Sequence, residues 1–174
     1  MKKYLILASV PVVLIVAVVV LSQGFGRLRA ALTGYEEVPA VSTVASGDFK
    51  AEINRDQTSV SYELSYSDLE GAVQQAHIHL GQKDVNGGIF VFLCTNLGNG
   101  PVGTQPCPPS PATITGAFNA SNIIGGANSQ GIAPGEFGEV LKAIRAGKTY
   151  ANVHSSKFPG GEVRSQIRNN HDDH

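Results

Sequence analysis

The chain has 174 residues, of which 42% are hydrophobic and only 16% are charged. This length allows one domain or two very small ones, and the hydrophobic content with little charge argues against a disordered chain. Four of the 13 basic residues precede Thr33, and the remainder of the chain carries 9 basic and 14 acidic residues. A nucleic-acid binder needs clustered Lys and Arg to replace phosphate counterions. The mildly acidic body therefore argues against a nucleic-acid partner.

Residues 1–24 have the pattern of an export or anchoring segment. Lys2 and Lys3 precede a run of 18 uncharged residues, Tyr4 to Leu21. A basic start followed by an apolar stretch is typical of a secretory signal, and the length of the run is close to what a transmembrane helix needs. The segment is predicted to be an uncleaved anchor or a cleaved signal peptide, followed by a linker over residues 25–31. Both interpretations place the body outside the cytoplasm, anchored to the membrane through this helix or secreted.

The body, residues 32–168, is predicted to consist of short strands separated by turns. Apolar and polar residues alternate within each run, and Gly, Pro, Asn and Asp mark the turns. One segment, residues 137–144, instead places its apolar residues on one face of a short helix. We expect an all-β fold, an antiparallel Greek-key-like β-sandwich or barrel of seven or eight strands with one short helix, behind the N-terminal transmembrane or signal helix. A disordered tail is predicted over residues 169–174. The predicted strands are 47–53, 60–66, 73–80, 88–94, 112–118, 150–154 and 162–168.

Cys94 and Cys107 are the only cysteines of the chain. Outside the cytoplasm an even pair of cysteines most often forms a disulfide. The segment between them is rich in Gly, Asn and Pro and has little other means of becoming ordered. The alternative is a pair of thiolate metal ligands, but the Cys-x-x-Cys spacing of zinc sites is missing. The pair is therefore predicted to be a disulfide.

Three histidines lie in predicted strands. His77 and His79 are two positions apart, so their side chains leave the same face of their strand. His154 falls on the polar face of another strand. If the two strands are neighbours, the three imidazoles form a set that suits zinc or copper and leaves an open position for water or a small ligand. The competing interpretation is a polar network of half-exposed histidines held by hydrogen bonds to Glu162 or Asn152.

Other polar residues share these faces and are candidates to support the imidazoles. Glu162 is a carboxylate that would orient an imidazole N–H, and Asn152 and Arg164 lie on the polar faces of the last two strands. The alternative for Glu162 is an ion pair with Arg164 or Arg168 along the strand, since such pairs are common on sheet faces.

Four segments of the body resemble the CHRD domain, a module named after chordin. The resemblance extends in order over residues 32–168, although Gly161 lengthens the last turn, Ser165 replaces a small glycine, and the segment from Cys94 to Pro111 is additional to the common pattern. The matching segments are Leu-Thr-Gly-Tyr-Glu-Glu-Val-Pro at 32–39, Ala-His-Ile-His-Leu-Gly at 76–81 with Asn-Gly-Gly at 86–88, Tyr-Ala-Asn-Val-His at 150–154, and Phe-Pro-Gly-Gly-Glu-Val-Arg-Ser-Gln-Ile at 158–167.

The resemblance implies an extracellular β module, and in chordin the CHRD domains belong to a protein that binds growth factors. The expected function is an extracytoplasmic binding or interaction module whose partner is an unidentified extracellular protein or small ligand. The His-x-His pair followed by Val-His is also similar to the copper ligands of copper/zinc superoxide dismutases, although their bridging histidine and zinc loop are missing. The alternative function is therefore a copper- or zinc-dependent enzyme with dismutase-like redox chemistry. The sequence contains no nucleophile–base motif, phosphate loop or nucleotide fingerprint, which favours binding over catalysis.

Overall fold

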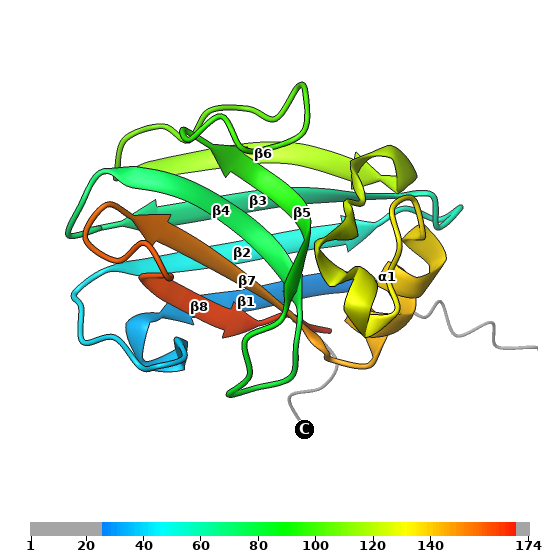
Figure 1. Cartoon of the computed structure of the whole chain (residues 1–174), viewed down its shortest axis with the longest axis horizontal. Helices are drawn as coiled ribbons and strands as arrows, with labels where there is room; N and C mark the ends of the chain where they lie inside the picture. The colour runs from blue at the N-terminus through cyan, green and yellow to red at the C-terminus, as the bar shows by residue number, and fades with distance from the viewer. Residues whose placement is uncertain (1–25, 170–174) are drawn as a thin grey trace, which may run out of the picture.

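An antiparallel sheet of nine strands curls until its two edges nearly meet in the computed structural model, which describes residues 26–169 (Figure 1). The expected all-β antiparallel fold with one short helix is confirmed, and the sheet is barrel-like. The strands are β1 Arg27–Thr33, β2 Ser46–Ile53, β3 Ser59–Ser67, β4 Val73–Leu80, β5 Gly88–Thr95, β6 Ala112–Asn119, β7 Thr149–Ser155, β8 Val163–Gln166 and β9 Arg168–Asn169; the helix is α1 Phe137–Arg145, and the 3-10 turns are η1 Gly34–Glu36, η2 Ala120–Asn122 and η3 Gly125–Gln130.

The strand order is β5-β4-β7-β8-β1-β2-β3-β6, with the short β9 added on β1, so β5 and β6 form the two edges. Side chains connect these edges. Gln105 Nε2 donates to Leu93 O in β5 and to Thr115 O in β6, each at 3.2 Å. The Tyr62 hydroxyl, from β3, also donates to Leu93 O at 3.0 Å. These bonds occupy one backbone carbonyl on each edge strand, which is then less available for pairing with another chain.

The core lies inside the curled sheet and is closed at one end by α1 (Figure 1). Phe49, Leu64 and Phe118 are among its largest fully buried side chains. The apolar face predicted for the helix is buried as expected. Just after the helix, Gly147 adopts a positive φ of 63°, which ends the helix without the strain that a β-carbon would cause.

The prediction of a linker over residues 25–31 is wrong, because Arg27–Thr33 forms β1. Leu28, Ala30 and Leu32 point into the core, and β1 pairs along its whole length with β2. The alternation of these three residues is a strand signal that the preceding apolar run obscures. Asn169, assigned to the tail, is also paired as part of β9.

The predicted signal or anchor helix, residues 1–24, and the tail residues 170–174 lie outside the described residues. Among residues 26–169, no helix combines the length and the apolar character that crossing a bilayer requires.

Cys94 and Cys107 form the predicted disulfide, with their α-carbons 5.1 Å apart. The bond fastens the additional segment 95–106 to the end of β5, where Thr95 N also donates to Gln105 O at 3.0 Å. The alternative of two metal thiolates is therefore wrong for this structure.

We expect the Cys94→Ser/Cys107→Ser variant to lose about 3 kcal/mol of unfolding free energy. The disulfide closes a loop and lowers the conformational entropy of the unfolded chain, so its removal stabilises the unfolded state. Urea denaturation of the parent and the variant, each with and without a reductant, measures the loss. Reduction is expected to lower the stability of the parent to that of the variant and to leave the variant unchanged. Equal stability of the two oxidised proteins would contradict the prediction.

Candidate functional site

The strand register brings the three predicted histidines together. His77 is directly opposite Asn152 across the β4–β7 ladder, and Gln75 is opposite His154. His154 is therefore the diagonal neighbour of His77 on the same face, within reach of its side chain. On the other side of β4, the β4–β5 register shifts between Ala76 and His77 and again next to His79. Bulges of this kind re-aim side chains and are common beside functional sites.

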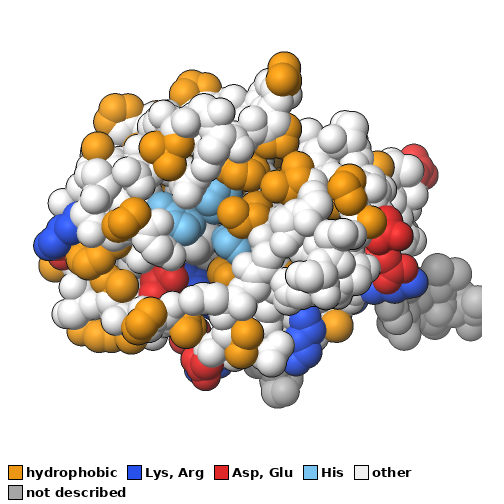
Figure 2. All heavy atoms as spheres, in the orientation of Figure 1, with side chains coloured by type: hydrophobic (Ala, Val, Ile, Leu, Met, Phe, Trp, Pro, Cys, Tyr) orange, Lys and Arg blue, Asp and Glu red, His pale blue; other side chains and the backbone are white. Residues whose placement is uncertain are grey.

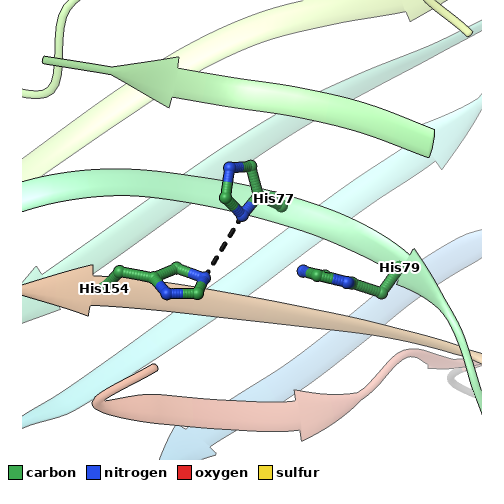
Figure 3. A group of neighbouring side chains, drawn as sticks. All are labelled: His77, His79 and His154. Atoms are coloured by element: carbon green, nitrogen blue, oxygen red, sulfur yellow. Dashed lines mark hydrogen bonds between the residues drawn. The ribbon is translucent and has the colours of Figure 1, made fainter. Parts of the chain in front are cut away.

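One nitrogen from each imidazole points toward a common centre (Figure 3). His77 Nδ1 lies 3.2 Å from His154 Nε2. The three inward nitrogens all lie within 4.8 Å of one another. The structure thus confirms that His77, His79 and His154 form one cluster, built from two adjacent strands.

Backbone carbonyl groups orient two of the three rings. His79 Nδ1 lies 2.9 Å from Gly87 O, and His154 Nδ1 lies 2.9 Å from Pro159 O. A carbonyl oxygen only accepts hydrogen bonds, so His154 Nδ1 carries the proton and His154 Nε2 presents a lone pair to the cluster, as His79 Nε2 does in the tautomer that bonds Gly87 O. This arrangement of outer hydrogen bond and inner lone pair is the one that metal-binding histidines show.

The cluster is more deeply buried than the competing network of half-exposed histidines implies. His77 is 0% exposed, and His79 and His154 are 7% and 6% exposed. Figure 2 shows histidine atoms at the bottom of a hollow on one face, so the cluster opens toward solvent there. Burial, with the neighbouring imidazoles adding to it, lowers the pKa of His77 to about 2. Burial lowers the pKa of His79 to about 4 and also lowers that of His154, so all three rings are neutral at pH 7.

Asn152 contacts the cluster as predicted, with Oδ1 3.1 Å from His79 Nε2. His79 therefore lies between two oxygen acceptors, Gly87 O and Asn152 Oδ1. A neutral imidazole has a single N–H and satisfies only one of them. The Nε2 side of His79 is consequently a place where a cation relieves the repulsion between two lone pairs.

Arg164 supports the site through an intervening residue, Tyr150, and not as the direct neighbour of an imidazole that the sequence predicted. Its guanidinium lies 3.4 Å from the centre of the Tyr150 ring, and that ring stacks on His79 with centroids 4.6 Å apart. Arg164 also donates to Asn86 Oδ1 and to Val85 O, at 3.0 and 2.8 Å. It therefore holds the segment that ends in Gly87, the acceptor of His79.

The predicted role of Glu162 as an orienting carboxylate for an imidazole is wrong. Glu162 is fully buried, and its Oε1 accepts from Thr43 Oγ1 at 2.9 Å and from the backbone N–H of Glu70 at 2.8 Å. These contacts tie the segment before β2 and the segment before β4 to the start of β8. Glu162 is a structural residue that supports the loops around the cluster.

Glu37, by contrast, is a functional candidate that the sequence pattern did not single out. It is buried, and its Oε1 has no hydrogen-bond partner among the described residues. Burial raises its pKa to about 7, while the charge of Arg164 and hydrogen bonds from Val38 and Asn152 act in the opposite direction. The sequence feature that could have identified Glu37 is its position in the 32–39 segment, one of the four segments that resemble the CHRD domain.

The fold and this site define an all-β domain with a buried cluster of three neutral histidines. A family model described as the CHRD domain matches residues 28–167. The chain therefore belongs to the CHRD domain family, and the match begins within β1. This membership suggests an extracellular interaction module. Neither a search of curated proteins nor a search of solved structures gives a match.

The free energy of unfolding is expected to fall as the pH decreases from 6.5 toward 4. The pKa values of the three histidines are lowered in the folded chain, so the unfolded chain takes up protons first and is favoured by acid. Each histidine contributes up to about 1.4 kcal/mol per pH unit in this range. Glu37, whose pKa is raised from 4.5 to about 7, opposes the trend, but it is one group against three.

Urea denaturation of the parent and of a His77→Gln/His79→Gln/His154→Gln variant at several pH values between 7 and 4.5 measures this dependence. The variant lacks the three buried bases, so its stability is expected to be nearly independent of pH or to rise slightly in acid. The same acid-induced loss in both proteins would show that other groups cause it.

Proposed function

We propose that this chain is an extracytoplasmic CHRD-domain binding module that holds one copper or zinc ion on His77, His79 and His154. The observation that carries the proposal is the convergence of three neutral imidazole nitrogens from β4 and β7. Two nitrogens bound to one tetrahedral zinc at about 2.0–2.1 Å lie roughly 3.3–3.4 Å apart. His77 Nδ1 and His154 Nε2, 3.2 Å apart, already have nearly this spacing.

Three protein ligands leave one position of a tetrahedral ion for an external donor. The hollow above the histidines in Figure 2 supports access from solvent to that position. The partner that fits is a small ligand or a donor side chain of an extracellular protein. A metal-dependent enzyme, the alternative function, would use the same open position and therefore depends on the same ion.

The location outside the cytoplasm is supported by two features of the chain. The Cys94–Cys107 disulfide is of the kind that persists in oxidising compartments. The basic start and uncharged 18-residue run of the N-terminal segment favour export and a membrane anchor.

Metal content of the purified full-length chain tests the proposed site. The protein is loaded separately with Cu²⁺ and Zn²⁺, freed of excess metal, and measured by elemental mass spectrometry. All proteins carry His171→Ala and His174→Ala, which removes weak binding by the tail. The parent is expected to retain about one ion per chain, since three histidines form a complete protein ligand set, and His77→Ala/His79→Ala is expected to retain none.

Gln75→Ala is the matched control, because Gln75 lies on β4 two residues before His77 and makes a side-chain bond only to Asn99 among the described residues. It is expected to retain as much metal as the parent. A parent that retains no ion, or a double histidine variant that retains as much as the parent, would overturn the proposal. Retention by the parent would justify assays of redox activity in the copper-loaded form.

The N-terminal segment is tested by the intact mass of the chain from the membrane fraction. An uncleaved anchor predicts the full mass of 18.2 kDa in the membrane fraction, resistant to extraction by salt or alkali. A cleaved signal predicts a shorter chain in the soluble extracytoplasmic fraction. A full-length chain found only in the soluble cytoplasmic fraction would contradict both forms of the proposal.

A further inference from the structure

We propose that Glu37 is the proton-exchanging counter-charge of the three-histidine site, so that binding of a divalent ion there releases a proton from its carboxyl group. This inference rests on the metal site proposed above and adds a control of that site by pH. It is carried by where the Glu37 carboxyl group lies and by what surrounds it.

The carboxyl group is enclosed but incompletely bonded. Glu37 is 6% exposed and its Oε1 is unpartnered within residues 26–169. Gly161 packs directly on it, since a β-carbon there would lie 2.4 Å from Oε1. A buried acceptor without a donor is costly for a carboxylate. The ionised form of Glu37 is therefore destabilised in the absence of additional positive charge.

The same carboxyl group touches both structural supports of the cluster. On one side Asn152 lies near enough to lower the pKa of Glu37, and it presents its Oδ1 to His79 Nε2. On the other side Gly161 belongs to the turn whose Pro159 O orients His154, a turn closed by the Gly161 N–H bonding Phe158 O. Glu37 is thus linked to His79 through Asn152 and to His154 through the turn that contains Gly161.

The charged and titratable groups that face Glu37 do not hold its carboxyl group in the ionised form. Arg164 of β8 acts on it through its charge, but its guanidinium donates to the segment 82–86 and stacks on Tyr150. Tyr150 of β7 also interacts with it, and burial raises the pKa of Tyr150, so that its hydroxyl stays neutral at pH 7. Burial outweighs these partners and raises the pKa of Glu37 to about 7.

A divalent ion on three neutral imidazoles adds two positive charges to this buried region. Opposite charge favours the ionised carboxylate, so metal binding and loss of the Glu37 proton promote each other. His77 and His79 do not compete with the metal for protons in this range, because burial lowers the pKa of His77 to about 2 and that of His79 to about 4, and burial lowers the pKa of His154 as well. Glu37 is therefore the expected source of pH dependence between pH 6 and 8.

The test is the Zn²⁺ affinity of the full-length chain at pH 6, 7 and 8, measured by competition with a chelator of known affinity, with His171→Ala and His174→Ala in all proteins. Release of one proton corresponds to about a tenfold rise in affinity per pH unit below the pKa and a smaller rise above it. Between pH 6 and 8 the affinity of the parent is expected to rise roughly tenfold more than that of Glu37→Gln, since the amide of the variant does not titrate and all other ionisations are common to both proteins.

Two further variants separate charge from structure. Glu36→Gln removes the adjacent carboxylate, which lies at the surface near Lys83, and is expected to keep the pH dependence of the parent. Glu37→Asp retains a titratable group and is expected to retain a pH dependence. Zinc added to weakly buffered protein at pH 7 should release more protons per chain from the parent than from Glu37→Gln, by a fraction of a proton, because ionisation of a water on the zinc is common to both proteins.

The outcomes separate the two proposals. A parent that binds no zinc at any pH overturns the proposed metal site. A parent that binds zinc with an affinity independent of pH, or a folded Glu37→Gln variant that keeps the parent's pH dependence and proton release, overturns the role of Glu37 and leaves the metal site standing.

Discussion

The burial of a polar sheet face is the constraint on which the rest of the structure depends. β4, β7 and β8 bury apolar residues on the face that points into the barrel. In β7 every residue is buried, so its outer face is covered as well. Imidazole, amide and guanidinium groups on the second face therefore lose water, and each loss is costly unless a hydrogen bond replaces it. The loops after β1, β4 and β7 supply those bonds mainly through backbone groups, which ties the loop conformations to the sheet.

Gly87 shows how closely the loops and the sheet are fitted. Its carbonyl accepts from His79, and its N–H donates to the Tyr150 hydroxyl at 3.1 Å. A β-carbon at Gly87 would lie 1.6 Å from Leu80 O, so no other residue fits this position without moving the strand. Asn86, just before it, donates to Val38 O and accepts from Arg164. The Asn-Gly pair is a turn signal in the sequence and a fixed support of His79 in the structure.

The sequence predicted the features that depend on local pattern. Alternation located β2 to β8, helical spacing located α1, and the two-residue spacing of His77 and His79 placed them on one face. It missed β1, because the short alternation of Leu28, Ala30 and Leu32 follows soon after the much longer apolar run of residues 4–21, which dominates the pattern of the N-terminal region. It could not place Glu162 and Glu37, because both act through loop contacts between residues far apart in the chain, such as Thr43 with Glu162.

Glu37 and Glu162 are both buried, but their surroundings differ. Glu162 Oε1 accepts hydrogen bonds from Thr43 Oγ1 and from the Glu70 N–H, while its Oε2 has no partner among the described residues. Glu37 has Arg164 nearby, but the guanidinium directs its hydrogens at the 82–86 segment and its face at Tyr150. The positive field of Arg164 therefore disfavours a cation at the histidines while failing to fix the charge of Glu37. A nearby negative charge favours an ion that binds three neutral rings in this field, and the proposed source of that charge is the Glu37 carboxyl group, whose pKa of about 7 lets it ionise when the ion arrives.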